Sequence, residues 1–288
     1  MKKPLVLLLS IFCLSLSLKA QSLLWEISGN GLKQPSYLFG TYHAMGEDFV
    51  TEQEHVMQAL DASELIVVEM IMDSSKLFQF ALTMMLPDTT LHEMVSDEEY
   101  KLIGSELLRL TGTDIATFDR MKPISLAATM SMAYVKEADS TQLTEETTAM
   151  DFYFTSYAKA NNKEAKGLET MMEQADLLMN QIPLEEQVEW LLELVNNKDA
   201  TLQEGLALKK AYTNQDLATI YSIYSEMPEA SGELAFMVDE RNHNWMKKIP
   251  EIIEQQPAFI AVGALHLPGK EGLIELLNKA GYTVNPIR

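Results

Sequence analysis

A seven-residue pattern that occurs once near each end of the chain places the strongest constraint on its fold. Residues 40–46 and 263–269 share the spacing Gly-x-x-His-x-x-Gly, so His43 and His266 occupy equivalent positions. A short apolar run of the kind that forms a buried strand comes directly before each copy. We therefore expect each histidine to lie in a loop at the carboxyl end of a strand.

The segments that follow the two histidines also correspond to each other. Each pattern is followed by apolar residues at helical spacing and then by a second strand-like run, at residues 65–68 in the first copy and 282–284 in the second. The predicted order in each half is therefore strand, histidine loop, helix, strand. The expected fold class is α/β (α+β), with both halves contributing to one central sheet.

A mainly helical region, about residues 74–230, separates the two halves. Apolar residues recur in it at helical spacing, and Ser96 with Glu99 forms a capping box that marks a helix start. The helix over residues 74–86 is apolar over too wide an arc for a simple surface helix. Further helices are predicted over residues 184–195, 202–227 and 231–249. We expect one domain over residues 21–288, in which the helical region is a large insertion.

The first 20 residues predict a signal peptide. A basic start is followed by an apolar stretch, residues 5–18, which is shorter than the roughly 20 residues of a spanning helix. Ala20 is a small residue at the expected cleavage position. Cleavage there would also remove Cys13, the only cysteine, so no disulfide is expected. We expect a periplasmic or secreted protein with no stable membrane insertion after cleavage.

The charge of the chain limits its partners. The formal net charge is −20 and no run of basic residues occurs, which argues against nucleic acid or an anionic membrane surface as a partner. Solubility alone explains such acidity, and a cationic ligand is compatible with it. The expected partner is a peptide or small-molecule substrate.

Two acidic residues stand out by position. Glu69 directly follows the strand-like run at residues 65–68, and Glu169 directly follows a second candidate strand at 164–168. With His43 and His266 they place four polar groups at the carboxyl ends of four strands, where ligands bind in open α/β sheets. The alternative is that each glutamate is an ordinary acid at a helix N-terminus.

Arg241 and Asn242 lie on the apolar stripe of the helix predicted over residues 231–249. Burying a guanidinium is unfavourable unless an anion accompanies it. We therefore expect Arg241 to contact a carboxylate, an oxyanion formed during a reaction, or both. A purely structural ion pair is the alternative.

The chain resembles the TraB/GumN family, which includes the Tiki proteases. The resemblance lies in residues 36–43, 67–69, 167–174, 240–242 and 261–269. It implies a fold similar to erythromycin esterases and to ChaN-like haem-uptake proteins, with both histidine loops at one site. It also implies metal-dependent peptidase activity with Mn²⁺ or Co²⁺ that needs no HExxH motif. The chain has no HExxH motif, which argues against an ordinary zinc protease that carries one. The functional residues that the resemblance implies are His43, Glu69, Glu169, Arg241, Asn242 and His266.

One hypothesis combines these observations. A divalent metal held by His43, Glu69 and His266 would activate a water, and Glu169 would take its proton. Arg241 and Asn242 would then stabilise the oxyanion. Two alternatives remain: a metal-free hydrolase similar to the erythromycin esterases, in which a histidine is the general base, and a metal- or haem-binding protein without turnover.

Overall fold

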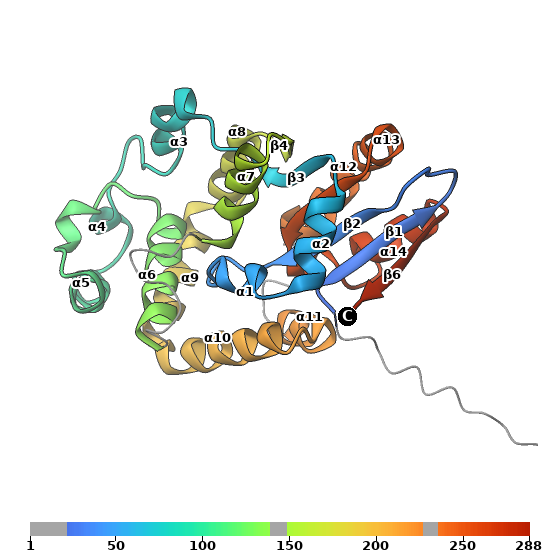
Figure 1. Ribbon diagram of the computed structural model, residues 1–288. Helices are drawn as coiled ribbons and strands as arrows, with labels where there is room; N and C mark the ends of the chain where they lie inside the picture. Colours follow the sequence, from blue (N-terminus) through green and yellow to red (C-terminus); the bar gives the residue numbers. More distant parts are fainter. Residues whose placement is uncertain (1–21, 139–148, 227–235) are drawn as a thin grey trace, which may run out of the picture.

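The computed structural model describes residues 22–138, 149–226 and 236–288 (Figure 1). A six-stranded sheet with the order β4-β3-β5-β2-β1-β6 forms its centre. The strands are β1 (Leu24–Gly29), β2 (Ser36–Thr41), β3 (Leu65–Met70), β4 (Glu164–Glu169), β5 (Ala258–Gly263) and β6 (Tyr282–Ile287). The predicted signal peptide lies outside the described residues.

The strands that carry the two histidine loops, β2 and β5, lie side by side. They pair in parallel, with Gly40 opposite Val262 and Thr41 opposite Gly263, and β3 and β4 continue the parallel part of the sheet beyond β5. The α/β prediction is confirmed. The two halves nevertheless interleave, because β5 of the second half lies between β2 and β3 of the first. Strand β1, which is not among the expected strands, pairs antiparallel with β2 and β6.

Helices cover the sheet and form a lobe beside it (Figure 1). They are α1 (Asp48–Thr51), α2 (Glu54–Ala62), α3 (Leu77–Thr83), α4 (Leu91–Met94), α5 (Asp97–Thr111), α6 (Pro123–Ala138), α7 (Met150–Ala160), α8 (Met171–Asn180), α9 (Leu184–Asn196), α10 (Lys198–Thr213), α11 (Leu217–Glu226), α12 (Arg241–Trp245), α13 (Ile249–Gln255) and α14 (Leu273–Lys279). Three short 3₁₀ helices, η1 (Ser74–Lys76), η2 (Ile115–Thr117) and η6 (Ala264–His266), and one π-helix, η5 (Phe236–Glu240), lie among them in the described ranges. None of the helices in the described ranges is both long and apolar enough to cross a membrane.

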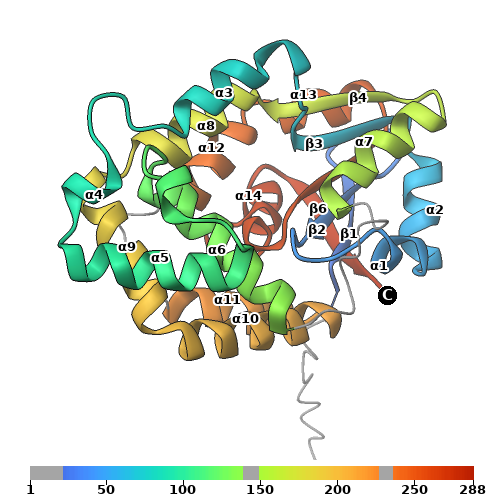
Figure 2. The ribbon, with the colours of Figure 1, turned by 90° about the vertical axis from the view of Figure 1, so that its left-hand side faces the viewer.

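The helical insertion has an apolar core of its own. Helices α5, α6 and α9 enclose fully buried side chains that include Ile103, Leu126 and Leu191. Figure 2 shows this lobe in front of the sheet. The predicted start of α5 is confirmed, because Ser96 and Glu99 form both hydrogen bonds of a capping box.

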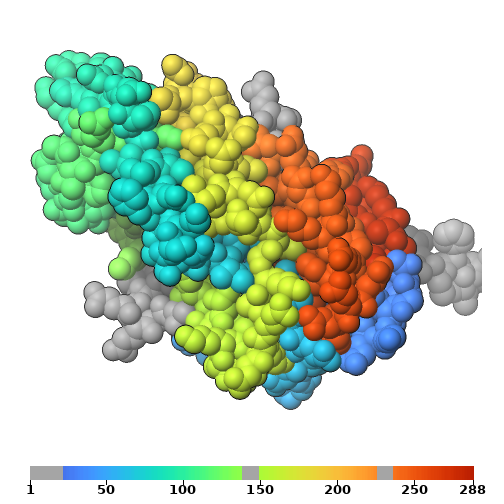
Figure 3. Space-filling view, turned by 90° about the horizontal axis from the view of Figure 1, so that it is seen from above, coloured from blue at the N-terminus to red at the C-terminus, as the bar shows by residue number. Residues whose placement is uncertain are grey.

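Three helix predictions need correction. The helix predicted over 202–227 is two helices, α10 and α11, because Gln215 adopts a positive φ of 56° that interrupts it. The helix predicted over 231–249 is divided into η5, α12 and the first residue of α13, and residues 231–235 lie outside the described part. The third correction concerns α3, whose apolar arc is not fully covered. Helix α3 packs mainly on α8, and Phe78 in it is 75% exposed. Figure 3 shows the face of the molecule on which α3 lies.

Candidate functional site

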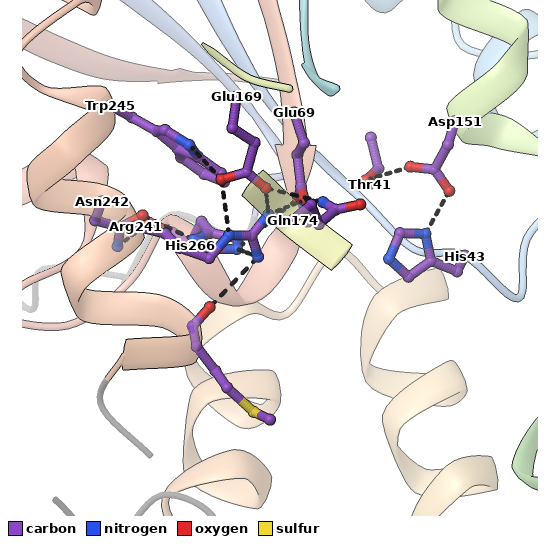
Figure 4. A network of polar contacts seen from close by, with 12 residues as sticks. Thr41, His43, Glu69, Asp151, Glu169, Gln174, Arg241, Asn242, Trp245 and His266 are labelled. Atoms are coloured by element: carbon purple, nitrogen blue, oxygen red, sulfur yellow. Dashed lines mark hydrogen bonds and ion pairs between the residues drawn. The ribbon is translucent and has the colours of Figure 1, made fainter. Parts of the chain in front are cut away.

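The four polar groups that the sequence places at strand ends lie at one edge of the sheet. Glu69 is the penultimate residue of β3, Glu169 is the last residue of β4, and His266 ends η6 directly after β5. His43 follows β2 in the loop before α1. Because β4, β3, β5 and β2 are neighbouring parallel strands, their carboxyl ends meet there. Figure 4 shows the side chains of Glu69, Glu169, His43 and His266 in this region.

Gly40, the first residue of the pattern at residues 40–46, lets this segment approach the second pattern at residues 263–269 closely. A Cβ at Gly40 would lie 3.0 Å from the Cα and 3.1 Å from the Cβ of Ala264. We predict that Gly40→Ala lowers the free energy of unfolding by about 1–3 kcal/mol through overpacking, measured by urea denaturation. The control is Gly205→Ala in helix α10. The nearest atom to its Cβ would be 3.7 Å away, so this change should be neutral or stabilising. Equal stability of the two variants would contradict the close approach.

Arg241, from α12, joins the two glutamates. Its Nη2 donates to Glu69 Oε2 at 2.5 Å and to Glu169 Oε1 at 2.6 Å, and its Nε donates to Glu169 Oε2 at 3.3 Å. Its Nη1 donates to the Met237 carbonyl at 3.4 Å and to His266 Nε2 at 3.1 Å. All five N–H groups of the guanidinium therefore have acceptors. The expected contact of Arg241 with a carboxylate is confirmed.

His266 is buried and neutral. Arginine only donates hydrogen bonds, so the His266 Nε2 that faces Arg241 is an acceptor and the proton lies on Nδ1. That Nδ1 donates to Asn242 Oδ1 at 2.8 Å. Burial lowers the pKa of His266 to about 3, and the positive charge of Arg241 acts in the same direction.

Asn242 fixes the orientation of the His266 imidazole. Its Nδ2 donates to the carbonyls of His266 at 3.2 Å and Glu271 at 2.8 Å, and its side chain is fully buried. Neither Asn242 nor Arg241 has a free N–H for an oxyanion in this arrangement.

Glu69 remains ionised despite its burial. Burial alone would raise the pKa of its carboxyl, but the guanidinium of Arg241 and the N–H of Gly263, 2.7 Å from Glu69 Oε1, hold the pKa well below its usual range. Gln174 from α8 strengthens the arrangement, because its Nε2 donates to Glu69 Oε2 at 3.2 Å and to Glu169 Oε1 at 3.0 Å. We call Glu69, Glu169, Gln174, Arg241 and His266 the arginine cluster.

His43 lies to one side of the arginine cluster and pairs with Asp151 (Figure 4). Its Nδ1 is 2.5 Å from Asp151 Oδ2, and Thr41 donates to the other carboxylate oxygen at 3.1 Å. The hydrogen bond to Asp151 raises the pKa of His43 to about 9. The imidazole is 69% exposed, and its Nε2 has no hydrogen-bond partner among the residues described here. Nε2 is therefore accessible for proton transfer or for a ligand.

Three residues of this site are not among the functional residues expected from the sequence. Asp151 lies in the first turn of α7, where an acid is common for helical reasons alone, so no local signal marks it. Gln174 belongs to a stretch that resembles the family, and this is the only signal for it. Trp245 donates its indole N–H to Glu169 Oε2 at 3.2 Å, and its position on an apolar stripe predicts only a core residue.

The three residues expected to hold a metal do not fit one in this arrangement. Among the described residues, no three histidine, cysteine or acidic side chains are placed to hold an ion together. The reason at this site is Arg241, which contacts both Glu69 and His266. A metal on those two residues would bind at about 2.0–2.2 Å, close to a guanidinium that already supplies the positive charge. His43, the third residue, is paired with Asp151 instead.

A cavity of about 260 Å³ opens beside His43. Its polar wall includes His43, Asp151, Glu69 and Gln174, and most of its other lining residues are apolar. His43 is therefore placed to act on a group bound in this cavity.

The fold and the site together define a class of α/β protein in which two equivalent histidine loops follow adjacent parallel strands at the centre of a sheet. The TraB/PrgY/gumN family model matches residues 23–286, nearly the whole chain, and the chain belongs to this family. No curated protein and no solved structure gave a significant match.

Proposed function

We propose that the protein is a hydrolase of an acyl bond, an ester or a peptide, in which His43 transfers the proton. The observation that carries the proposal is the His43–Asp151 pair at the wall of a cavity, with Nε2 of His43 accessible. A carboxylate on Nδ1 fixes the imidazole and stabilises its protonated form, as in other His–Asp pairs that activate a nucleophile.

The proposed reaction uses neutral His43 as a general base. Its Nε2 takes a proton from a water molecule while the water oxygen attacks the substrate carbonyl. Asp151 stabilises the imidazolium that forms, and His43 then returns the proton to the leaving alkoxide or amine. Two members of the arginine cluster, Glu69 and Gln174, form part of the polar wall of the cavity. Because every N–H of Arg241 is already used, we give it a positioning role in this proposal.

A metal-dependent peptidase, as the family resemblance implies, is the second candidate. One observation favours it: both histidines have Nδ1 fixed by an oxygen acceptor, Asp151 or Asn242, which is the usual support of metal-ligating imidazoles. This candidate requires Arg241 to move away from His266 and Glu69, so we rank it second. Capture of haem without turnover fits less well, because 260 Å³ is below the roughly 300–1,000 Å³ of pockets that bury drug-sized ligands.

Screening the purified protein tests the proposal. It would be assayed against a fluorogenic peptide library and a series of p-nitrophenyl esters, with EDTA and separately with Mn²⁺ or Co²⁺. Turnover that EDTA leaves unchanged supports the proposed function. Turnover that appears only with added metal would instead establish the second candidate. His43→Ala should reduce the turnover. Its matched control is His92→Ala, which removes another His–Asp pair, His92 Nε2 to Asp97 Oδ1 at 3.1 Å, at a remote surface site.

The pH dependence of turnover provides a further prediction. His43 must lose its proton to act as a base, so kcat/KM should rise about tenfold per pH unit and level off above a pH of about 9. The free energy of unfolding should instead decrease as the pH rises. The pKa of His43 is raised on folding, so its stabilising effect is complete below about pH 6.5 and is lost as the pH rises through 9. A pH profile that levels off below pH 7 would contradict His43 as the base.

A further inference from the structure

We propose that the cavity beside His43 is a subsite for an apolar side chain or acyl group of the substrate, adjoining the carbonyl that is hydrolysed. This inference rests on the proposed function, and it adds the chemical class of the substrate.

The cavity has an apolar floor that cannot rearrange easily. Val68, Phe154 and Ala261 line it, and all three are buried in the main core, where Phe154 packs against the rings of Phe39 and Phe259. Tightly packed interiors keep their shape. The floor therefore offers a permanent apolar surface at the carboxyl ends of the strands.

The rim of the cavity consists of large apolar side chains that are exposed. Ile71 and Met72 are 37% and 40% exposed, and Phe152 is 53% exposed, although all three line the same cavity. Single exposed apolar residues are ordinary, but a group of them around a concave site that also holds a few polar groups is typical of ligand pockets. Met72 is unbranched and can adapt to different groups.

The rim residues lie next to the polar residues of the cavity along the chain. Phe152 directly follows Asp151, so the same turn of α7 fixes the imidazole of His43 and presents an aromatic ring at the mouth. Ile71 comes two residues after Glu69 at the end of β3. An apolar group held by the rim therefore places the adjoining part of its molecule next to His43.

The charges of the cavity favour a neutral group. No lysine or arginine lines it within the described ranges. Its two carboxylates are both paired, Asp151 with His43 and Glu69 with Arg241. A charged group would thus enter an apolar space without a partner, which is unfavourable. The volume of about 260 Å³ suits one side chain or a medium-length acyl chain.

A chain-length series of esters tests the subsite. We expect kcat/KM to rise about fourfold for each added methylene from p-nitrophenyl acetate towards the hexanoate, until the cavity is filled. Phe152→Ala should reduce the hexanoate-to-acetate ratio about tenfold. The control is Phe78→Ala on α3, an exposed phenylalanine outside the cavity, which should leave the ratio unchanged. Equal turnover of all chain lengths would overturn the subsite while leaving the hydrolase proposal intact.

A binding measurement separates the two proposals if no ester is hydrolysed. The fluorescence of N-phenyl-1-naphthylamine, a neutral apolar probe, would be titrated with the wild type and with both variants. Saturable binding that Phe152→Ala weakens about tenfold, and Phe78→Ala leaves unchanged, supports the apolar subsite even without turnover. Equal binding by Phe152→Ala and the wild type, or a loss caused by Phe78→Ala, would overturn it.

Discussion

Replacing His43 by alanine should reduce kcat/KM by about 10²–10⁴-fold, the usual contribution of a general acid or base. His43 is 69% exposed and lies in a loop, but its pair with Asp151 stabilises the fold at neutral pH, so the free energy of unfolding should fall at neutral pH and change less above pH 9. The measurement is kcat/KM with the best ester or peptide found in the screen, together with urea denaturation. Full activity in this variant would remove the proposed mechanism. His92→Ala, the remote surface pair, should retain wild-type activity.

The role of Asp151 can be distinguished from a merely structural one. Asp151→Asn keeps the size of the side chain and an oxygen acceptor for Nδ1 of His43 but removes the negative charge. The pKa of His43, raised to about 9 by Asp151, should then fall towards its usual value of about 6.5. The pH at which kcat/KM levels off should move down with it. An unchanged pH profile would show that another group is the base.

Replacing Arg241 by methionine should have the largest effect on stability. The Arg241 side chain is 8% exposed and pairs with two carboxylates, Glu69 and Glu169, whose side chains are only 15% and 11% exposed, so its loss leaves both without their cation. Breaking a buried ion pair from one side destabilises a protein by about 3–5 kcal/mol. Urea denaturation would measure this change. The matched control is Arg109→Met. Arg109 also bridges two carboxylates, Glu106 and Glu137, but is 41% exposed. Glu106 is buried but keeps Lys198 and Tyr134 as partners, so the loss of Arg109 should have an effect of about 1 kcal/mol or less.

A combined variant keeps this test decisive if Arg241→Met does not fold. Adding Glu69→Gln and Glu169→Gln removes the charges that Arg241 compensates, so most of the lost stability should return. Failure of this triple variant to regain stability, or an Arg241→Met variant as stable as the wild type, would contradict the compensation of charge.

The sequence by itself places four of the polar groups correctly. Strand-like runs and the repeated histidine pattern are local signals, and the carboxyl ends of parallel strands must meet at one edge of a sheet. Glu69, Glu169, His43 and His266 therefore come together as expected. The need of a buried guanidinium for an anion likewise anticipates that Arg241 contacts a carboxylate.

Only the tertiary structure shows how these groups are paired. Asp151 comes from a helix 108 residues beyond His43 in the chain, and no local pattern connects the two. The sequence groups His43 with Glu69 and His266 as ligands of one ion. In the fold, Arg241 pairs with the last two and Asp151 with the first. Likewise, the apolar arc of α3 predicts burial, but packing on α8 covers only part of it.

The physical reason is the range of the interactions. The sequence determines where strands end and which side chains lie there, because backbone preferences and hydrophobic periodicity act over a few residues. Charge pairing and cavity shape depend on the packing of segments far apart in the chain. The tertiary structure therefore decided that an arginine neutralises Glu69, and that His43 faces an apolar cavity.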